Sequence, residues 1–189
     1  LGDIHPEVAD LWENIGALYH YRNDLDKALE YYEKALEIRK NAYGENNPEV
    51  AASYDAIARI HHSQQKYEKA AYYYKEAIRI LEAALGEKHI EIPERLHNLA
   101  LLYTSMNKTE EAEALHKRGL AISREAWGAD HIRTTRSLEA YGYFLMTSDR
   151  YQEAVDLFSH ADRILAREER TTEFYAQLLA DMGRCFVML

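Results

Sequence analysis

Glycine recurs at a fixed interval along the chain, and this interval constrains the fold more than any other feature. Four glycines are each separated by 42 residues, and four alanines keep the same spacing: Gly2, Gly44, Gly86 and Gly128, with Ala28, Ala70, Ala112 and Ala154. An interval of this length is typical of repeat proteins, in which each repeat buries its apolar face against its neighbours. The sequence therefore predicts four copies of one structural unit.

Within each unit the apolar residues follow the 3.6-residue period of an amphipathic helix rather than the alternation of a strand. The first unit shows two such runs, Trp12-Ile15-Gly16-Tyr19 and Leu25-Ala28-Tyr32-Ala35-Leu36, and the other units repeat them. A small residue recurs where two helices must approach closely, as Gly16, Ala58, Ala100 and Gly142. Each unit is therefore predicted to be a pair of amphipathic helices.

Turn residues mark the ends of these helices. Between the two helices of each pair stand Asn23, Gln65, Asn107 and Asp149. Asn and Asp tolerate the left-handed backbone conformation that ends a helix. We predict first helices near 7–21, 49–63, 91–105, 132–147 and 172–187, and second helices near 25–41, 67–84, 109–126 and 151–167. The predicted units are about 5–46, 47–88, 89–130 and 131–170, followed by the first helix of a fifth unit at 171–189.

Composition and charge exclude several classes of protein. The 189 residues include 23 Lys and Arg against 32 Asp and Glu, a net charge of −9, which argues against nucleic-acid binding because that binding rests on a basic surface. No uncharged stretch reaches the roughly 20 apolar residues of a membrane helix, and the first residues lack a signal-peptide pattern. The single cysteine, Cys185, cannot form an internal disulfide. These observations predict a soluble, cytoplasmic protein that binds neither nucleic acid nor membrane.

The sequence carries no recognised catalytic or metal-binding motif. It contains no G-x-S-x-G, P-loop or G-x-G-x-x-G, and its eight glycines all fall on positions of the repeat. His61 and His62 are the only adjacent histidines, and neighbouring helix positions point about 100° apart, so the two do not readily share a metal ion. His61 takes the position of Tyr19 and Tyr103, which predicts a packed core histidine. We therefore expect no enzyme activity, no metal and no cofactor.

The first unit resembles the tetratricopeptide repeat (TPR), whose pattern W-x₂-L-G-x₂-Y…A-x₃-F is matched by Trp12-x₂-Ile15-Gly16-x₂-Tyr19…Ala28-x₃-Tyr32. The 42-residue length resembles the kinesin light chain type of this repeat, as do HPEVA at 5–9, YEKALEIR at 32–39 and LHNLALLY at 96–103. The resemblance covers essentially the whole chain. It implies an all-α fold, a single TPR array over 1–189 that forms a right-handed superhelical solenoid of antiparallel helix pairs.

The resemblance also implies a peptide-binding groove lined by the first helices. The stripe next to the packed stripe would face it: Asp10, Glu13, Asn14, Ala17, Asp55, Arg59, His62, Glu94, His97, Asn98, Leu101, Arg136, Glu139 and Tyr143. Asn14 and Asn98 match the asparagine of the kinesin light chain L-x-N-L-A motif, which in that family faces the peptide. This implies a non-catalytic adaptor or scaffold that binds a protein or peptide in the groove.

Charge in this stripe suggests what kind of partner it takes. Five acids stand against two arginines, namely Asp10, Glu13, Asp55, Glu94 and Glu139 against Arg59 and Arg136. Kinesin light chains use basic groove residues for acidic peptides that contain tryptophan, so this stripe departs from that family pattern. We expect a partner segment that carries Lys or Arg.

A structural role is the alternative, in which arrays assemble through exposed ends or faces while the groove stays empty. The first residues match the end of a second helix, and the fifth first helix has no partner helix, so we expect a fragment of a longer protein. An apolar stripe on that last helix is then expected to be exposed or covered by another molecule, at Leu178, Leu179, Met182 and Phe186. It offers a route to self-association.

Overall fold

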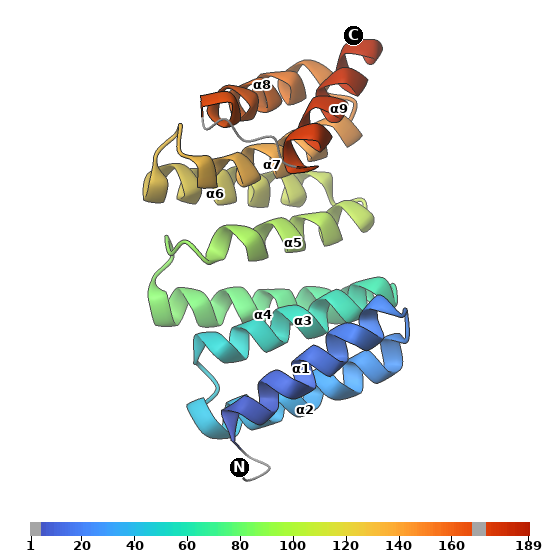
Figure 1. Cartoon of the computed structure of the whole chain (residues 1–189), viewed down its shortest axis with the longest axis vertical. Coiled ribbons are helices and arrows are strands. Elements are labelled where there is room, and N and C mark those ends of the chain that lie inside the picture. Colours follow the sequence, from blue (N-terminus) through green and yellow to red (C-terminus); the bar gives the residue numbers. More distant parts are fainter. Residues whose placement is uncertain (1–4, 168–172) are drawn as a thin grey trace. The chain divides into compact units, whose positions relative to one another are not determined.

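The computed structural model describes residues 5–167 and 173–189, and these residues form helices joined by short connections (Figure 1). The described helices are α1 (Pro6–Tyr21), α2 (Leu25–Tyr43), α3 (Pro48–Ser63), α4 (Tyr67–Leu85), α5 (Ile92–Ser105), α6 (Thr109–Trp127), the 3₁₀ turn η1 (Ile132–Thr134), α7 (Thr135–Thr147), α8 (Tyr151–Arg167) and α9 (Glu173–Met188). The predicted helices are confirmed, and their ends differ by no more than two residues except that η1 precedes α7. The first four predicted units correspond to pair 1 (α1, α2), pair 2 (α3, α4), pair 3 (α5, α6) and pair 4 (η1 with α7, α8).

The four predicted turn residues all take the left-handed backbone conformation. Their φ angles are 60° at Asn23, 59° at Gln65, 58° at Asn107 and 58° at Asp149. A non-glycine residue at positive φ is uncommon, so four of them at one spacing show that the turn inside each pair is the same structure. The turn reverses the chain, which allows the two helices of a pair to pack against each other.

The connections between pairs use glycine for its conformation. Gly44, Gly86 and Gly128 have φ angles of 83°, 95° and 99°, and a Cβ atom at any of them would meet nothing within 4 Å. Each glycine N–H closes the last turn of the preceding helix, as Gly44 does with the carbonyl of Lys40. This closure explains why the second helices of the first three pairs run one or two residues beyond their predicted ends.

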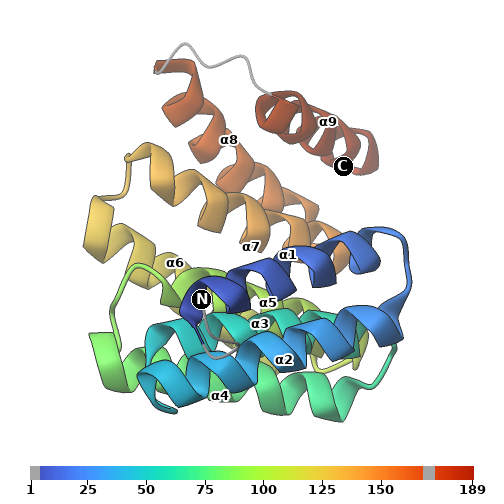
Figure 2. The ribbon, with the colours of Figure 1, turned by 60° about the horizontal axis from the view of Figure 1, so that its bottom comes forward.

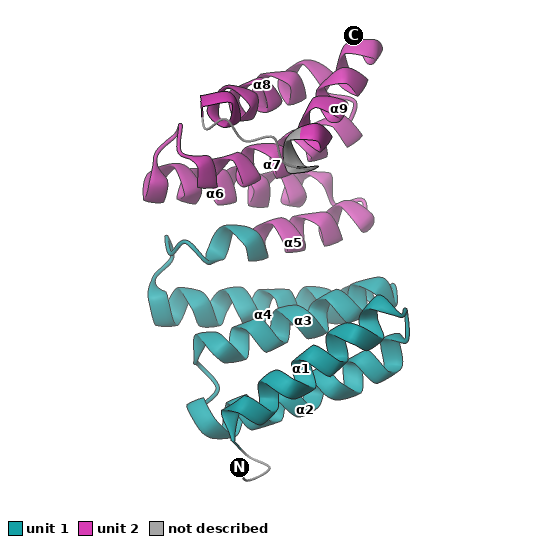
Figure 3. Cartoon of the chain, viewed as in Figure 1, with its two compact units in different colours: residues 1–95 teal, residues 96–189 magenta. Residues whose placement is uncertain are grey.

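The chain divides into two compact units, residues 1–95 and residues 96–189 (Figure 3). In unit 1, α1 packs on α2 and α3 packs on α4, while α2 also packs on α3 (Figure 2). Its core contains small residues where helices meet and larger ones between them, including Ala9, Ala28, Tyr32, Ala56, Ile57 and Ile60. The predicted packing of His61 is confirmed, since it is buried and stacks on Tyr73.

Unit 2 has one continuous core. It joins α7, α8 and α9 with parts of α5 and α6, and its largest buried side chains include Leu138, Phe144, Leu145 and Phe158. Gly142 on α7 is the small residue at the crossing with α8, because a Cβ atom there would lie 2.5 Å from the ring of Phe158. The predicted role of this glycine in close packing is therefore confirmed.

The apolar stripe predicted on the last helix is covered in part by the chain itself. Leu178 and Cys185 are fully buried in the core of unit 2, and Met182 packs against it. The expectation that Leu178 is exposed or covered by another molecule is therefore wrong, because α9 packs on α8 through this side. Leu179 and Phe186 remain exposed, as predicted.

Candidate binding surface

The sequence-predicted binding residues lie on the first helices of the pairs, and they differ in exposure. Eight are exposed: Asp10, Asn14, Ala17, Arg59, Glu94, Leu101, Arg136 and Tyr143. Four are half-buried (Glu13, His62, Asn98 and Glu139), and two are buried (Asp55 and His97). One repeat position is exposed in all four pairs, and it is occupied by Ala17, Arg59, Leu101 and Tyr143.

A second repeat position, filled by Glu13, Asp55, His97 and Glu139, turns inward instead of facing a groove. Glu13 reaches Arg39 on the second helix of its own pair at 2.5 Å, and the Nδ1 atom of His97 lies 3.2 Å from Nδ1 of His116 on the second helix of pair 3. Asp55 and His97 are only 8% and 7% exposed. The expectation that these two residues face outward is wrong, because the helix presents this position to its partner helix.

Three acids of the predicted stripe in unit 1, Asp10, Glu13 and Asp55, lie close to arginines. Arg39 on α2 is buried and contacts the carboxylates of Asp10 (2.8 Å) and Glu13 (2.5 Å) on α1. Asp55 and Arg59, one turn apart on α3, are separated by 3.5 Å. These pairs offset much of the acidity that the sequence suggested for this stripe.

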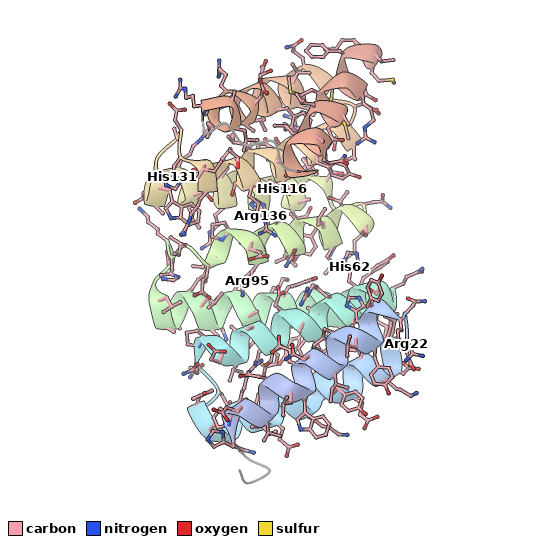
Figure 4. All side chains as sticks on the ribbon, in the orientation of Figure 1. Arg22, His62, Arg95, His116, His131 and Arg136 are labelled. Atoms are coloured by element: carbon pink, nitrogen blue, oxygen red, sulfur yellow. The ribbon has the colours of Figure 1, made fainter. Side chains whose placement is uncertain are left out.

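Burial shifts the pKa of three titratable residues of the predicted stripe, Glu139, His62 and His97. Burial raises the pKa of the Glu139 carboxyl to about 7, although nearby Arg136 acts in the opposite direction. Burial lowers the pKa of His62, whose ring meets the edge of Tyr67 at a centroid distance of 6.0 Å. His62 and Arg136 are labelled in Figure 4, on α3 and α7 respectively.

An open apolar hollow of about 600 Å³ lies within unit 2. It is lined by the end of α7, the start of α8 and one face of α9, through Met146, Tyr151, Ala180, Gly183, Arg184, Val187 and Met188. Met146 follows Tyr143 by one helical turn, so the hollow begins where the exposed stripe of α7 ends. Val187 and Met188 are largely exposed, and a side chain from another molecule can reach them.

Sequence reasoning missed two features of this surface. The first is Arg39, a buried cation next to Ile38 in the apolar run of α2. A charged residue at a repeat position that is otherwise buried was the signal that could have predicted its ion pairs. The second is the pair Val187 and Met188, which line the hollow from α9. In the fifth unit Val187 occupies the position that His62 holds in the predicted binding stripe, when the 42-residue repeat is shifted by one residue toward the N-terminus, and Met188 follows it. Extending the stripe onto α9 would have found them.

Neither a metal site nor a membrane-spanning helix is present in the described residues. No group of three or more His, Cys, Asp or Glu side chains in residues 5–167 and 173–189 is arranged to hold a metal ion. Over the same ranges, no helix combines the length and the apolar character needed to cross a membrane.

The helix pairs, their left-handed turns and the close-packed small residues define a helical repeat protein. The tetratricopeptide repeat family profile matches residues 7–83 and 73–125, which together span more than half of the chain. The chain belongs to the tetratricopeptide repeat family, and its fold is similar to that of solved kinesin light chain-like repeat structures. This fold supports a protein-interaction or scaffold module.

Solved structures of similar fold extend over most of the chain. BtubC (BKLC) from P. vanneervenii is 26% identical, with a TM-score of 0.74 over 89% of this chain and 67% of that chain. A kinesin light chain-like protein of Podospora anserina with nearly identical TPR-like repeats is 19% identical, with a TM-score of 0.78 over 97% of this chain and 88% of that chain. A substituted variant of that protein is 20% identical, with a TM-score of 0.79 and coverages of 97% and 87%. No curated protein matches the sequence.

Proposed function

We propose that this chain is a non-catalytic protein-interaction module that binds a peptide segment of a partner protein along its first helices. The observation that carries the proposal is the apolar hollow of unit 2, which continues the exposed stripe of α7 onto α9. Binding energy at protein interfaces concentrates in a few buried apolar anchors, and an open hollow of about 600 Å³ has room for such a side chain. Tyr143 and Met146 lead into it from α7.

Polar groups on the same helices would orient the peptide. Asn14 in unit 1 and Asn98 in unit 2 are each proposed to hold the backbone of a peptide bound to its own unit through the amide side chain, as the resemblance to kinesin light chain repeats implies. A basic flank is a secondary preference, since Asp10, Glu13 and Asp55 are already accompanied by Arg39 or Arg59. Exposed ion pairs contribute only about 0–1 kcal/mol each, so the apolar anchor dominates affinity.

The experiment is a selection from a displayed library of short random peptides against the full chain, repeated with two variants. Val187→Glu places a charge in the hollow at a largely exposed residue, and Leu179→Glu places the same charge on α9 outside the residues that line it. We expect peptides with a large apolar residue that lose binding to Val187→Glu and keep it with Leu179→Glu. Enriched peptides that bind both variants equally, or no enrichment at all, would contradict the proposal.

Self-assembly is the second candidate, and the exposed apolar residues of α9 favour it. Leu179 and Phe186 present 46% and 58% of their surface to solvent. Exposed apolar surface of this kind is often an interaction site, so a second copy is a candidate occupant. Light scattering over a range of concentrations tests it: a mass that rises with concentration in the wild type and not in Phe186→Glu would support self-assembly, whereas a constant mass would exclude it.

A further inference from the structure

Three repeat positions of pair 3 hold residues of a different kind from those at the same positions in the other three pairs. Pairs 1, 2 and 4 combine an acid on the first helix with an aromatic residue and an alanine on the second, as Glu13/Tyr32/Ala35, Asp55/Tyr74/Ala77 and Glu139/Phe158/Ala161. Pair 3 places His97, His116 and Gly119 at the corresponding positions. All three residues of this set change together, which indicates that they form one packing unit.

The two histidines are buried against each other. Their rings stack with a centroid distance of 5.2 Å, and their Nδ1 atoms are 3.2 Å apart. His116 is fully buried and His97 nearly so. Gly119 provides the space, because a Cβ atom there would lie 2.8 Å from Cε1 of His97.

The hydrogen bonds around the pair are made by neutral groups. Nε2 of His97 lies 3.1 Å from the hydroxyl of Ser137, which is 2.7 Å from the hydroxyl of Ser123. The Nδ1–Nδ1 contact has room for one proton, so one ring donates and the other accepts. Nε2 of His116 is buried and has no hydrogen-bond partner among the described residues, and its ring packs on Phe144. A buried ring nitrogen without a partner costs much less free energy when it carries a lone pair than when it carries the N–H of a charged imidazolium.

The charged groups around the pair offer no compensation for a proton. The positive charge of Arg136 on α7 repels a proton on His97 and so lowers the pKa of His97 further. On α6, Glu113 is already held by Lys117, Arg150 and the hydroxyl of Tyr141, whose ring stacks on His116. The 3₁₀ turn η1 contributes Thr134, whose hydroxyl donates to the backbone carbonyl of Gly128. Figure 4 labels His116 and Arg136 on the neighbouring helices α6 and α7.

We propose that the His97–His116 pair is an acid-sensitive lock on unit 2: α6 and α7 stay packed with residues 96–105 of α5 only while both imidazoles are neutral. Burial lowers the pKa of both rings below the ordinary value of about 6.5. Below that pH the open chain binds up to two protons that the packed form does not, so stability falls as pH falls. The opening equilibrium then grows by as much as about 100-fold per pH unit, tenfold for each proton.

Amide hydrogen exchange of the full chain, corrected for the intrinsic exchange rate, measures this opening between about pH 7 and pH 4.5. In the wild type, protection of residues 96–147 should fall by more than tenfold per pH unit below about pH 6. The triple variant H97E/H116F/G119A installs the residues of pair 4 and should lose this acid response. His131→Asn alters an exposed capping histidine of the same unit to the residue found at Asn47, and it should retain the wild-type response.

A second measurement needs no variant. Ring C–H resonances of the two histidines, followed by NMR as pH is lowered, should show no protonation while residues 96–147 stay protected. Reversible titration of either ring near pH 6.5 in the packed form would overturn the proposal, as would an acid response that the triple variant, if folded, shares with the wild type.

Discussion

The guanidinium of Arg39 on α2 donates to the carboxylate of Asp10 on α1 over 2.8 Å. The same group donates to the hydroxyl of Ser53 on α3, also at 2.8 Å. Arg39 is buried whereas Asp10 is largely exposed. The buried cation therefore needs the carboxylate to compensate for its lost hydration, whereas Asp10 remains hydrated. A single side chain therefore joins three helices of unit 1.

Replacing Arg39 with Met keeps the length of the side chain and removes these contacts. The free energy of unfolding should fall by about 1–3 kcal/mol, less than for a fully buried pair because water can reach Asp10. Urea unfolding followed by circular dichroism gives this value. Arg79→Met is the matched control, since Arg79 is exposed on α4, and it should change stability by no more than about 0.5 kcal/mol. Equal effects of the two variants would rule out a special role for Arg39.

Gly142→Ala should destabilise unit 2 although alanine favours helix by about 1 kcal/mol. The added Cβ atom would lie 2.5 Å from Phe158, whose ring is fully buried and has no solvent side to move toward. Overpacking of this kind costs typically about 1–3 kcal/mol. Gly183→Ala on α9 meets nothing within 4 Å and should stabilise by up to about 1 kcal/mol. Thermal unfolding of the two variants should therefore shift in opposite directions.

Glu139→Gln should stabilise the protein at alkaline pH and have little effect in acid. The pKa of Glu139 is raised to about 7 by burial, so the folded chain holds a proton that the unfolded chain has released. Stability from this group is consequently lost as pH rises from about 4.5 to 7, and glutamine, which stays neutral, restores roughly 1–3 kcal/mol of it at about pH 8. Urea unfolding at about pH 5 and pH 8 tests the difference. An equal gain at both values would point to hydrogen bonding instead of ionisation.

Gln65→Asn should stabilise unit 1. Gln65 occupies a left-handed position with φ of 59°, where the other three pairs have Asn or Asp. Asparagine tolerates this conformation better than glutamine, and the expected gain is up to about 1 kcal/mol. The reciprocal change Asn23→Gln, in the same unit, should cost a similar amount in a thermal melt. Stabilisation by both changes would show that backbone strain is not the cause.

The repeat interval predicted most of the fold because each of its signals is local. A 42-residue spacing, the helical period and a turn residue at Asn23 and its equivalents are enough to place every described helix within a few residues. These signals depend on backbone conformation and on which stripe of a helix is apolar. Neither requires knowledge of long side chains or of distant contacts.

The binding surface was harder to predict because adjacent stripes on a helix differ by only one residue position, about 100° of rotation. Glu13 and His97 lie at the edge of the packed stripe. Whether each side chain points inward depends on the residue that faces it from another helix. That opposite residue is Arg39 in one case and His116 in the other, and both lie on a different helix. Leu178 was misplaced for the same reason, since its burial depends on how α9 meets α8.

The tight fit of His97 against Gly119 couples the residues that these two positions can hold. With an alanine at 119, as at Ala35, Ala77 and Ala161, an imidazole at 97 would meet a methyl group at 2.8 Å. A histidine at 97 in this packing therefore requires a residue without that methyl at 119. In turn, alanine fits at 119 without this clash only when the ring at 97 has been replaced. A variant that gives the third pair the residues of the other pairs must therefore change position 97 before position 119 or together with it.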